Sequence, residues 1–182
     1  MRVCLVPFLV ATVLEAHYAL SFGLFVAAGL TDAFDGMLAR MLKQRSQLGQ
    51  YLDPVADKLL LSTLFLALTH LGLIPVTVTA LVFGRDVGIL VVAAILYAAA
   101  GRREFGPSML GKANTVAQVA AVAAVLLQAM LMDQHATVRW VTTFKQGALY
   151  ATIALTVASG LHYAWIAARH VGAQTANGSA VK

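Results

Sequence analysis

Charged residues and cysteine are both scarce in this 182-residue sequence. Asp, Glu, Lys and Arg make up 12% of the chain, whereas a soluble domain has about 25%. The single cysteine, Cys4, cannot form an internal disulfide. These shortages exclude an intrinsically disordered chain, which depends on high charge, and a small domain that depends on disulfides.

Hydrophobic residues, in contrast, are abundant: they make up 60% of the chain, and the mean hydropathy is +0.79. An ordinary cytosolic enzyme of this size could not keep so much apolar surface from water. A bilayer-spanning helix takes about 20 residues, so the length allows about six spans with short loops. The sequence therefore predicts an all-α, polytopic membrane protein. About six transmembrane helices would form one bundle over residues 1–171, followed by a polar, flexible tail over residues 172–182.

Six apolar runs give the expected helices. They lie at Val3–Leu14, Tyr18–Thr31, Leu59–Leu68, Val76–Ala100, Thr115–Met132 and Ala148–Ala168. The second helix can continue to about Leu42, and the third can start near Asp53, which gives both enough length to cross a bilayer. The first run is short and has two interpretations: a signal-peptide core that follows Arg2, or a first helix that lacks part of its amino-terminal end.

Positive charge is concentrated on one side of the expected bundle. The formal net charge is +5, but no basic stripe is interleaved with aromatic residues, so no nucleic-acid partner is expected. If the amino terminus is cytoplasmic, that side carries Arg2, Arg40, Lys43, Arg45, Arg102, Arg103, Lys112, Arg169 and Lys182. The opposite side carries only Arg139 and Lys145. The positive-inside rule favours this orientation.

Four of the eight acidic residues are close together in the sequence: Asp32, Asp35, Asp53 and Asp57. They fall on the second and third expected helices, which share the cytoplasmic end, and the i, i+4 spacing of the last two puts them on one helix face. An ionisable side chain at membrane depth costs about 2.5–3.5 kcal/mol, so four carboxylates need a compensating positive charge. Clustered hard oxygen donors predict a divalent-metal site for Mg²⁺ or Mn²⁺ rather than zinc.

Small residues and an arginine share the face of the first two aspartates. At about 100° per residue, Asp32, Asp35, Gly36, Ala39 and Arg40 fall within a stripe about 140° wide. Gly36 and Ala39 leave room for a ligand to lie against the backbone. Arg40 offers a fixed cation for a phosphate.

A simpler interpretation makes the aspartates solvated charges or helix caps. Asp53-Pro54 is typical of a helix start, with Asp as the cap and Pro at the first position. A cap would explain Asp53 but would give no reason for Asp32, Asp35 and Asp57. The metal-site interpretation accounts for all four.

These positions form one longer pattern. It reads Asp32-x2-Asp35-Gly36-x2-Ala39-Arg40-x8-Gly49-x3-Asp53-x3-Asp57. The pattern resembles the complete signature of the CDP-alcohol phosphatidyltransferase family, because all eight fixed positions match with every spacing kept. The run Leu52–Lys58 and the six-span layout also resemble the family. The first helix differs, since family members usually carry Asn, Thr and Arg before its Pro, and here only Arg2 and Pro7 correspond.

The resemblance implies a role for each position. Asp32, Asp35, Asp53 and Asp57 would hold two divalent ions, Mg²⁺ or Mn²⁺, that bridge the pyrophosphate of CDP-diacylglycerol. The CDP part would contact Asp32, Gly36, Ala39, Arg40 and Gly49. Asp57 would also be the general base that takes the proton from an acceptor hydroxyl. The alcohol would attack the phosphorus nearest the lipid and CMP would leave, so no covalent nucleophile is required. A homodimer is also implied.

A second polar segment, Pro107–Thr115, lies on the same expected face, and Arg85-Asp86 lies inside the fourth apolar run. Arg85, Ser108 and Lys112 would receive the phosphate of the acceptor or of the lipid. Two simpler interpretations stay open: Arg85 and Asp86 neutralise each other, and Lys112 is a membrane-surface anchor.

The half of the chain that contains Arg85 and Lys112, called here the acceptor half, indicates which acceptor alcohol to expect. Its Arg-Asp-Val and Gly-Lys-x-Asn-Thr-x-x-Gln patterns resemble the glycerol-lipid branch of the family, which comprises phosphatidylglycerophosphate synthases and CDP-alcohol-type cardiolipin synthases. We therefore expect glycerol 3-phosphate or phosphatidylglycerol as the acceptor, ahead of inositol phosphate or serine.

Two other functions must be weighed against this enzyme. A small cation channel or transporter could use the aspartates as its ion site, but such sites lie near the bilayer midplane between paired half-repeats. A non-catalytic CDP-lipid-binding relative would fit the short first run. Metal-dependent release of CMP separates the enzyme from both. The expected location is the bacterial inner (cytoplasmic) membrane, with the active site on the cytoplasmic side.

Overall fold

The chain is all-α wherever its backbone is described. The structure is a computed structural model, and it describes the backbone of residues 2–41, 47–100, 109–134 and 138–179. Side chains are described for residues 6–31, 34, 58–89, 91, 109–134 and 138–162. Within these ranges there are six helices and no strand. They are α1 (Arg2–Leu14), α2 (Tyr18–Met41), α3 (Gln47–His70), α4 (Val76–Ala100), α5 (Met109–Asp133) and α6 (Arg139–Ser179).

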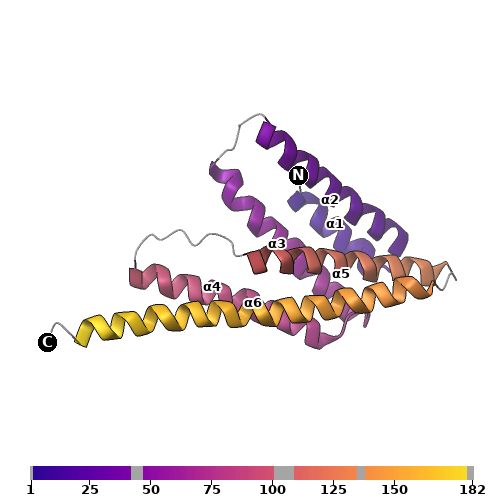
Figure 1. Ribbon diagram of the computed structural model, residues 1–182. Coiled ribbons are helices and arrows are strands. Elements are labelled where there is room, and N and C mark those ends of the chain that lie inside the picture. Colours follow the sequence, from indigo (N-terminus) through magenta and orange to yellow (C-terminus); the bar gives the residue numbers. More distant parts are fainter. Residues whose placement is uncertain (1, 42–46, 101–108, 135–137, 180–182) are drawn as a thin grey trace.

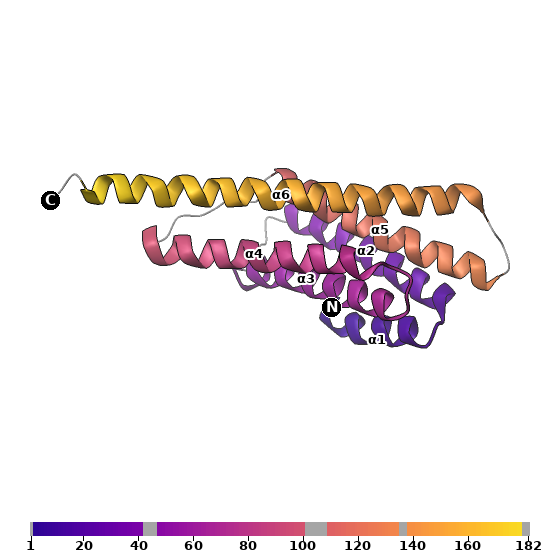
Figure 2. The same ribbon diagram turned by 90° about the horizontal axis from the view of Figure 1, so that it is seen from below.

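Successive helices run in opposite directions along the molecule (Figures 1 and 2). The carboxyl ends of α2, α4 and α6 and the amino ends of α3 and α5 lie on one side. The turns between α1 and α2 and between α3 and α4 lie on the other side. Both halves of the acidic pattern are therefore on helix ends of the same side, as the sequence predicts.

Two tight turns close the opposite side in the same way. Gly72, with φ +72°, follows α3, and Leu73 N–H donates to Leu68 C=O at 2.9 Å while Gly72 N–H donates to Thr69 C=O at 3.0 Å. The turn after α1 has the same pair of bonds, with Ala16 at φ 59° in place of glycine. This pattern of hydrogen bonds is the Schellman motif, which satisfies the last carbonyls of a helix.

The hydrophobic core is centred on α3. Leu64, Phe65 and Leu68 of this helix are fully buried. They cluster with buried side chains from α1, α4 and α5, namely Leu9, Val13, Val78, Val82, Val122, Val125 and Leu126. Burial of each such side chain contributes about 1.5–3 kcal/mol, so this cluster fixes α3 against three neighbouring helices.

A different kind of contact joins α5 to α6. α5 has buried small residues, including Ala121 and Ala124, and α6 contributes the buried polar residues Thr152, Thr156 and Ser159. The two helices lie side by side in both views (Figures 1 and 2), and α6 also packs on α4. Small residues let helix backbones approach closely, and hydroxyl groups can bond across the contact.

Several helices extend beyond the expected apolar runs: α5 begins at Met109 and α6 at Arg139, and two further boundaries change the interpretation of the sequence. α3 begins at Gln47, so Asp53 and Pro54 lie inside the helix and the interpretation of Asp53 as a helix cap is wrong. Gln47 and Gln50 are polar and hide such a start from an apolar pattern, although glutamine is a good helix former. α6 continues past Ala168 to Ser179 and includes most of the expected polar tail.

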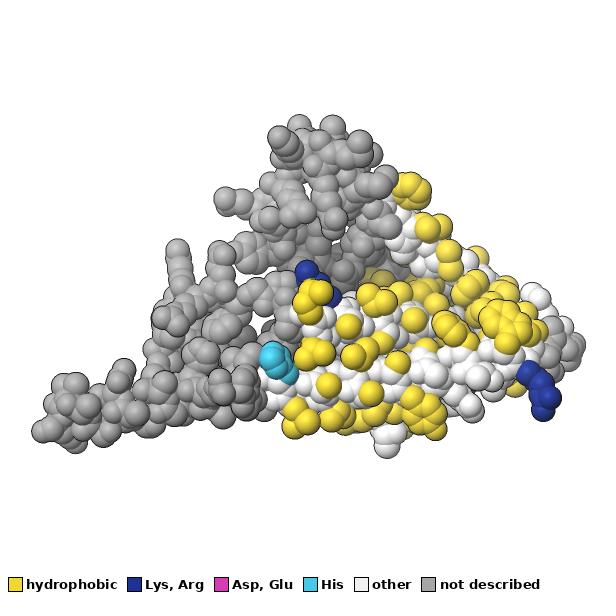
Figure 3. Space-filling model, in the orientation of Figure 1, with side chains coloured by type: hydrophobic (Ala, Val, Ile, Leu, Met, Phe, Trp, Pro, Cys, Tyr) yellow, Lys and Arg dark blue, Asp and Glu magenta, His cyan; other side chains and the backbone are white. Residues whose placement is uncertain are grey.

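Apolar side chains also cover the outside of the molecule. Figure 3 shows them spread over α5 and α6, and Val116, Tyr150 and Leu161 are each about two-thirds exposed or more. One helix in the described ranges, Met109–Asp133, is long and apolar enough to cross a bilayer, and Tyr18–Thr31 and Lys58–His70 are shorter apolar stretches. The six-span membrane bundle stays a prediction.

Candidate functional site

The backbone places the acidic pattern on two consecutive helices. α2 carries Asp32, Asp35, Gly36, Ala39 and Arg40, and α3 carries Gly49, Asp53 and Asp57. The side chains of these eight residues lie outside the described residues, as does the whole of Ser108. Their expected roles in metal and CDP binding therefore stay predictions. Among the described side chains, no group of three His, Cys, Asp or Glu residues could hold a metal ion.

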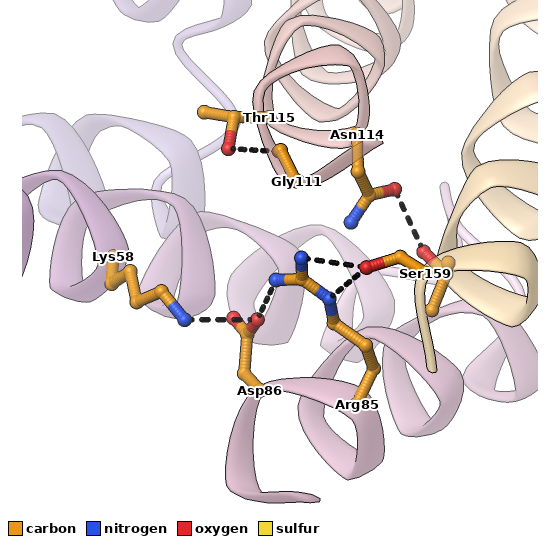
Figure 4. Close-up of polar contacts among 8 residues, drawn as sticks. Lys58, Arg85, Asp86, Gly111, Asn114, Thr115 and Ser159 are labelled. Atoms are coloured by element: carbon orange, nitrogen blue, oxygen red, sulfur yellow. Dashed lines mark hydrogen bonds and ion pairs between the residues drawn. The ribbon is translucent and has the colours of Figure 1, made fainter. Parts of the chain in front are cut away.

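A polar network begins one residue after Asp57 and connects three helices (Figure 4). Lys58 Nζ of α3 lies 3.1 Å from Asp86 Oδ1 of α4. The same Oδ1 accepts a hydrogen bond from Arg85 Nη1 at 2.7 Å. Arg85 also donates from Nε and Nη2 to Ser159 Oγ of α6, at 3.1 and 2.9 Å.

The network carries more positive than negative charge. Lys58 and Arg85 each contribute +1 and Asp86 contributes −1, which leaves an excess of one positive charge. The Arg85 side chain is only 8% exposed and that of Asp86 16%, whereas that of Lys58 is 46% exposed. Among the described side chains, the buried guanidinium shares its carboxylate with Lys58, and this favours an anion nearby, because charges interact more strongly away from water.

A second set of polar contacts lies beside Arg85. Asn114 of α5 is fully buried, and its Oδ1 accepts a hydrogen bond from Thr156 Oγ1 of α6 at 3.0 Å. Its Nδ2 has no hydrogen-bond partner within the described part of the chain, and neither has Nε2 of Gln118, one turn further along α5. In Figure 4 the amide nitrogen of Asn114 points toward the Arg85 guanidinium.

The described residues decide between some of the sequence interpretations for the acceptor half. Arg85 and Asp86 do pair with each other, although they are adjacent on a helix. The pairing is not a simple mutual neutralisation, because Asp86 is shared with Lys58 and Arg85 has a second partner in Ser159. Lys112 lies on the first turn of α5, is exposed, and forms no hydrogen bond or ion pair with another described residue.

Four residues of these contacts were not predicted as site residues: Lys58 and Asn114, although both lie in quoted motifs, and Thr156 and Ser159. A signal for the α6 residues was present, since Thr152, Thr156 and Ser159 follow i, i+4, i+7 spacing within an apolar helix and share a face. Asn114 and Gln118 form an i, i+4 pair in the same way. Polar stripes in apolar helices predict buried polar contacts between helices.

An apolar pocket lies next to the start of this network. It lies between α1 and α3 and is lined by Val6, Pro7, Val10, Leu14 and Leu59, with Thr63 as its one described hydroxyl. Leu59 and Thr63 follow Lys58 on α3 within about one and a half turns. The pocket offers apolar surface close to the helix segment that carries Asp57.

Comparison with known proteins matches the chain to one family. The family model described as CDP-alcohol phosphatidyltransferase matches residues 1–159. This range includes the whole acidic pattern, Lys58, Arg85, Asn114 and Ser159.

Three relatives illustrate the similarity. Human cardiolipin synthase (CMP-forming) is 36% identical over 143 residues, which cover 69% of this chain and 47% of the human protein. The Bacillus subtilis CDP-diacylglycerol–glycerol-3-phosphate 3-phosphatidyltransferase is 34% identical over 141 residues, covering 77% of this chain and 69% of the relative. A probable phosphatidylglycerophosphate synthase of Mycobacterium tuberculosis is 33% identical over 159 residues, covering 87% and 70%. The chain thus spans about half the length of the human relative and about two-thirds of the bacterial ones.

Proposed function

The chain belongs to the CDP-alcohol phosphatidyltransferase family, and from this premise we propose that it transfers a phosphatidyl group from CDP-diacylglycerol to a glycerol-type alcohol and releases CMP. The observation that carries the proposal is the match over residues 1–159, which contains every fixed position of the acidic pattern. The relatives' names support this reaction, since one names a phosphatidyltransferase that uses CDP-diacylglycerol and another a CMP-forming synthase.

The donor side of the site would be formed by α2 and α3. Asp32, Asp35, Asp53 and Asp57 form a donor set of hard carboxylate oxygens, which suits two Mg²⁺ or Mn²⁺ ions. Bound ions would neutralise the charge of the pyrophosphate and of the departing CMP. Gly36, Ala39, Arg40 and Gly49 would contact the CDP part, with the small residues permitting a close approach of the backbone. The pocket lined by Val10 and Leu59 supports a lipid substrate, because its apolar walls suit an acyl chain.

The reaction would be a direct displacement at phosphorus. The acceptor hydroxyl oxygen forms a bond to the phosphorus nearest the lipid, and the bond from this phosphorus to the CMP oxygen breaks, with its electron pair leaving on CMP. Asp57 takes the proton of the hydroxyl. Positioning and charge neutralisation supply most of the barrier reduction in such reactions.

The acceptor would bind beside the buried Arg85, with Ser108 and Lys112 as further phosphate contacts. The described part of this set supports the assignment in two ways: Arg85 belongs to a network with an excess of positive charge, and Lys112 is exposed and has no competing partner among the described residues. The bacterial relatives are named for glycerol 3-phosphate or phosphatidylglycerophosphate and the human relative for cardiolipin. A glycerol phosphate group is common to the two expected acceptors, glycerol 3-phosphate and phosphatidylglycerol.

The protein would work in a membrane. We propose an integral protein of the bacterial inner membrane, with α1–α6 as its spans and the helix ends that carry the aspartates on the cytoplasmic side. The apolar outer surface of α5 and α6 and the positive-inside pattern support this (Figure 3). A homodimer, which the family resemblance implies, is part of the same proposal.

The test is CMP release by purified protein from CDP-diacylglycerol with Mg²⁺ or Mn²⁺. The acceptor panel contains glycerol 3-phosphate, phosphatidylglycerol, inositol phosphate and serine. Asp57→Asn should abolish release, because it removes the proposed base and a metal ligand. Asp133→Asn is the matched control, since Asp133 is exposed at the far end of α5 and should keep full activity. Release that is equal in Asp57→Asn and wild type, or absent with every acceptor, would refute the proposal.

A further inference from the structure

Asn114 is a buried amide whose hydrogen bonding is incomplete. Its side chain is 0% exposed, and Thr156 Oγ1 occupies its carbonyl oxygen, which leaves Nδ2 with both N–H groups unpaired among the described residues. An unsatisfied buried donor costs about 1–3 kcal/mol. More than nine-tenths of buried polar groups have a partner, so an orphan of this kind calls for a ligand or a water.

The described group that this nitrogen faces is a donor rather than an acceptor. Figure 4 shows Nδ2 pointing toward the Arg85 guanidinium, which can only donate hydrogen bonds. Gln118 Nε2, one turn along α5, is a further buried amide nitrogen that has no hydrogen-bond partner among the described residues. Two described oxygens of the network, Asp86 Oδ1 and Ser159 Oγ, each already accept two contacts. Two donor groups that face one another require an acceptor atom between them.

From this geometry we infer that Asn114 is a specificity-determining residue for the acceptor, and that its Nδ2 donates a hydrogen bond to a phosphate oxygen of a glycerol phosphate group held by Arg85. The inference rests on the proposed function and adds a residue to it. A phosphate oxygen fits better than a hydroxyl, because it only accepts hydrogen bonds and carries the negative charge that the excess cation favours. Thr156 is then a positioning residue, since its hydroxyl holds the amide with the nitrogen toward the ligand.

The same glycerol phosphate group occurs in glycerol 3-phosphate and in phosphatidylglycerol, so the binding experiment has two arms. Purified protein in detergent is titrated with glycerol 3-phosphate in one arm and with short-chain phosphatidylglycerol in the other. Wild type should bind one of them, and Asn114→Leu should weaken that binding about tenfold or more, as expected for a lost hydrogen bond to a charged group. The arm that responds identifies the acceptor.

Two further variants separate ligand recognition from a structural role. Asn114→Asp places a carboxylate beside Arg85: a purely structural partner of this arginine should tolerate it or gain stability, whereas a phosphate contact should lose affinity about 100-fold through repulsion. Gln128→Met is the matched control, because Gln128 Nε2 also joins α5 to α6 through a threonine, Thr142, at 3.0 Å. It should keep wild-type affinity.

Failure of this inference can be distinguished from failure of the proposed function. In the CMP assay Asn114→Leu should raise the acceptor KM and leave the KM for CDP-diacylglycerol unchanged. The inference is overturned if neither ligand binds wild type, if Asn114→Leu and Gln128→Met bind equally well, or if Asn114→Asp keeps wild-type affinity. CMP release with intact acceptor affinity in Asn114→Leu would leave the transferase standing and remove this residue from it.

Discussion

The stability of the polar network should depend on Asp86 far more than on Lys58, although the two residues form one ion pair. Asp86 Oδ1 accepts from Lys58 Nζ at 3.1 Å and from Arg85 Nη1 at 2.7 Å. Its replacement by Asn keeps the shape and one amide oxygen but removes the charge. Arg85, with a side chain only 8% exposed, is then left as a buried cation without a counter-ion among the described residues.

Loss of one partner from a buried ion pair costs about 3–5 kcal/mol. We expect about 3 kcal/mol for Asp86→Asn, at the lower end, because Ser159 Oγ and the new amide oxygen still accept hydrogen bonds from Arg85. Lys58→Met should cost at most about 1 kcal/mol, because the Lys58 side chain is 46% exposed and Asp86 keeps its 2.7 Å contact with Arg85.

The assay is thermal unfolding of the purified variants in one detergent, without substrate. For a chain of this size 1 kcal/mol shifts the midpoint by about 2–4 °C, so Asp86→Asn should lower it by about 6–12 °C and Lys58→Met by less than about 4 °C. Equal shifts in the two variants, or a larger shift in Lys58→Met, would refute the reasoning that burial of Arg85 decides the energy.

Two further predictions concern the turns and the metal ions. Gly72→Ala should lower the midpoint by about 2–4 °C, because φ is +72° and an added Cβ meets nothing within 4 Å, which leaves only the conformational cost of about 1 kcal/mol. Ala16→Gly, at φ 59°, should leave the unfolding midpoint equal or raise it. A lower midpoint in both variants would contradict this account of the turns. Exhaustive treatment with EDTA should abolish CMP release and added Mg²⁺ or Mn²⁺ should restore it; undiminished release in the chelated sample would exclude the proposed ions.

The helices could be predicted from the sequence because apolar runs and helix length coincide in this chain. Val76–Ala100 was expected and found with the same bounds. The prediction stopped short where a helix continues through polar residues, as at Gln47 and beyond Ala168. Helix propensity continues through such residues, whereas the apolar pattern on which the prediction rests does not.

Likewise, only part of the candidate site could be predicted from the sequence. Spacing on one helix predicted which residues of α2 and α3 belong together, and Arg85 was singled out because a cation in an apolar run is rare. The partners of Arg85 could not be predicted, since they depend on how α4, α5 and α6 are rotated against one another. Ser159 and Thr156 acquire their roles only through this packing. It brings Ser159 Oγ to 2.9 Å from Arg85 Nη2, although the two residues are 74 positions apart in the sequence.

The network also connects the two halves of the proposed active site. Lys58 follows Asp57 on α3, and its ammonium contacts Asp86, the neighbour of Arg85 on α4. A substituted Asp86 would therefore disturb both the helix that carries the proposed base and the cation proposed for the acceptor phosphate. Because transfer between two bound substrates requires their reacting atoms within about 3–3.5 Å, a chain of short polar contacts between the donor and acceptor helices is a physical means of keeping that separation.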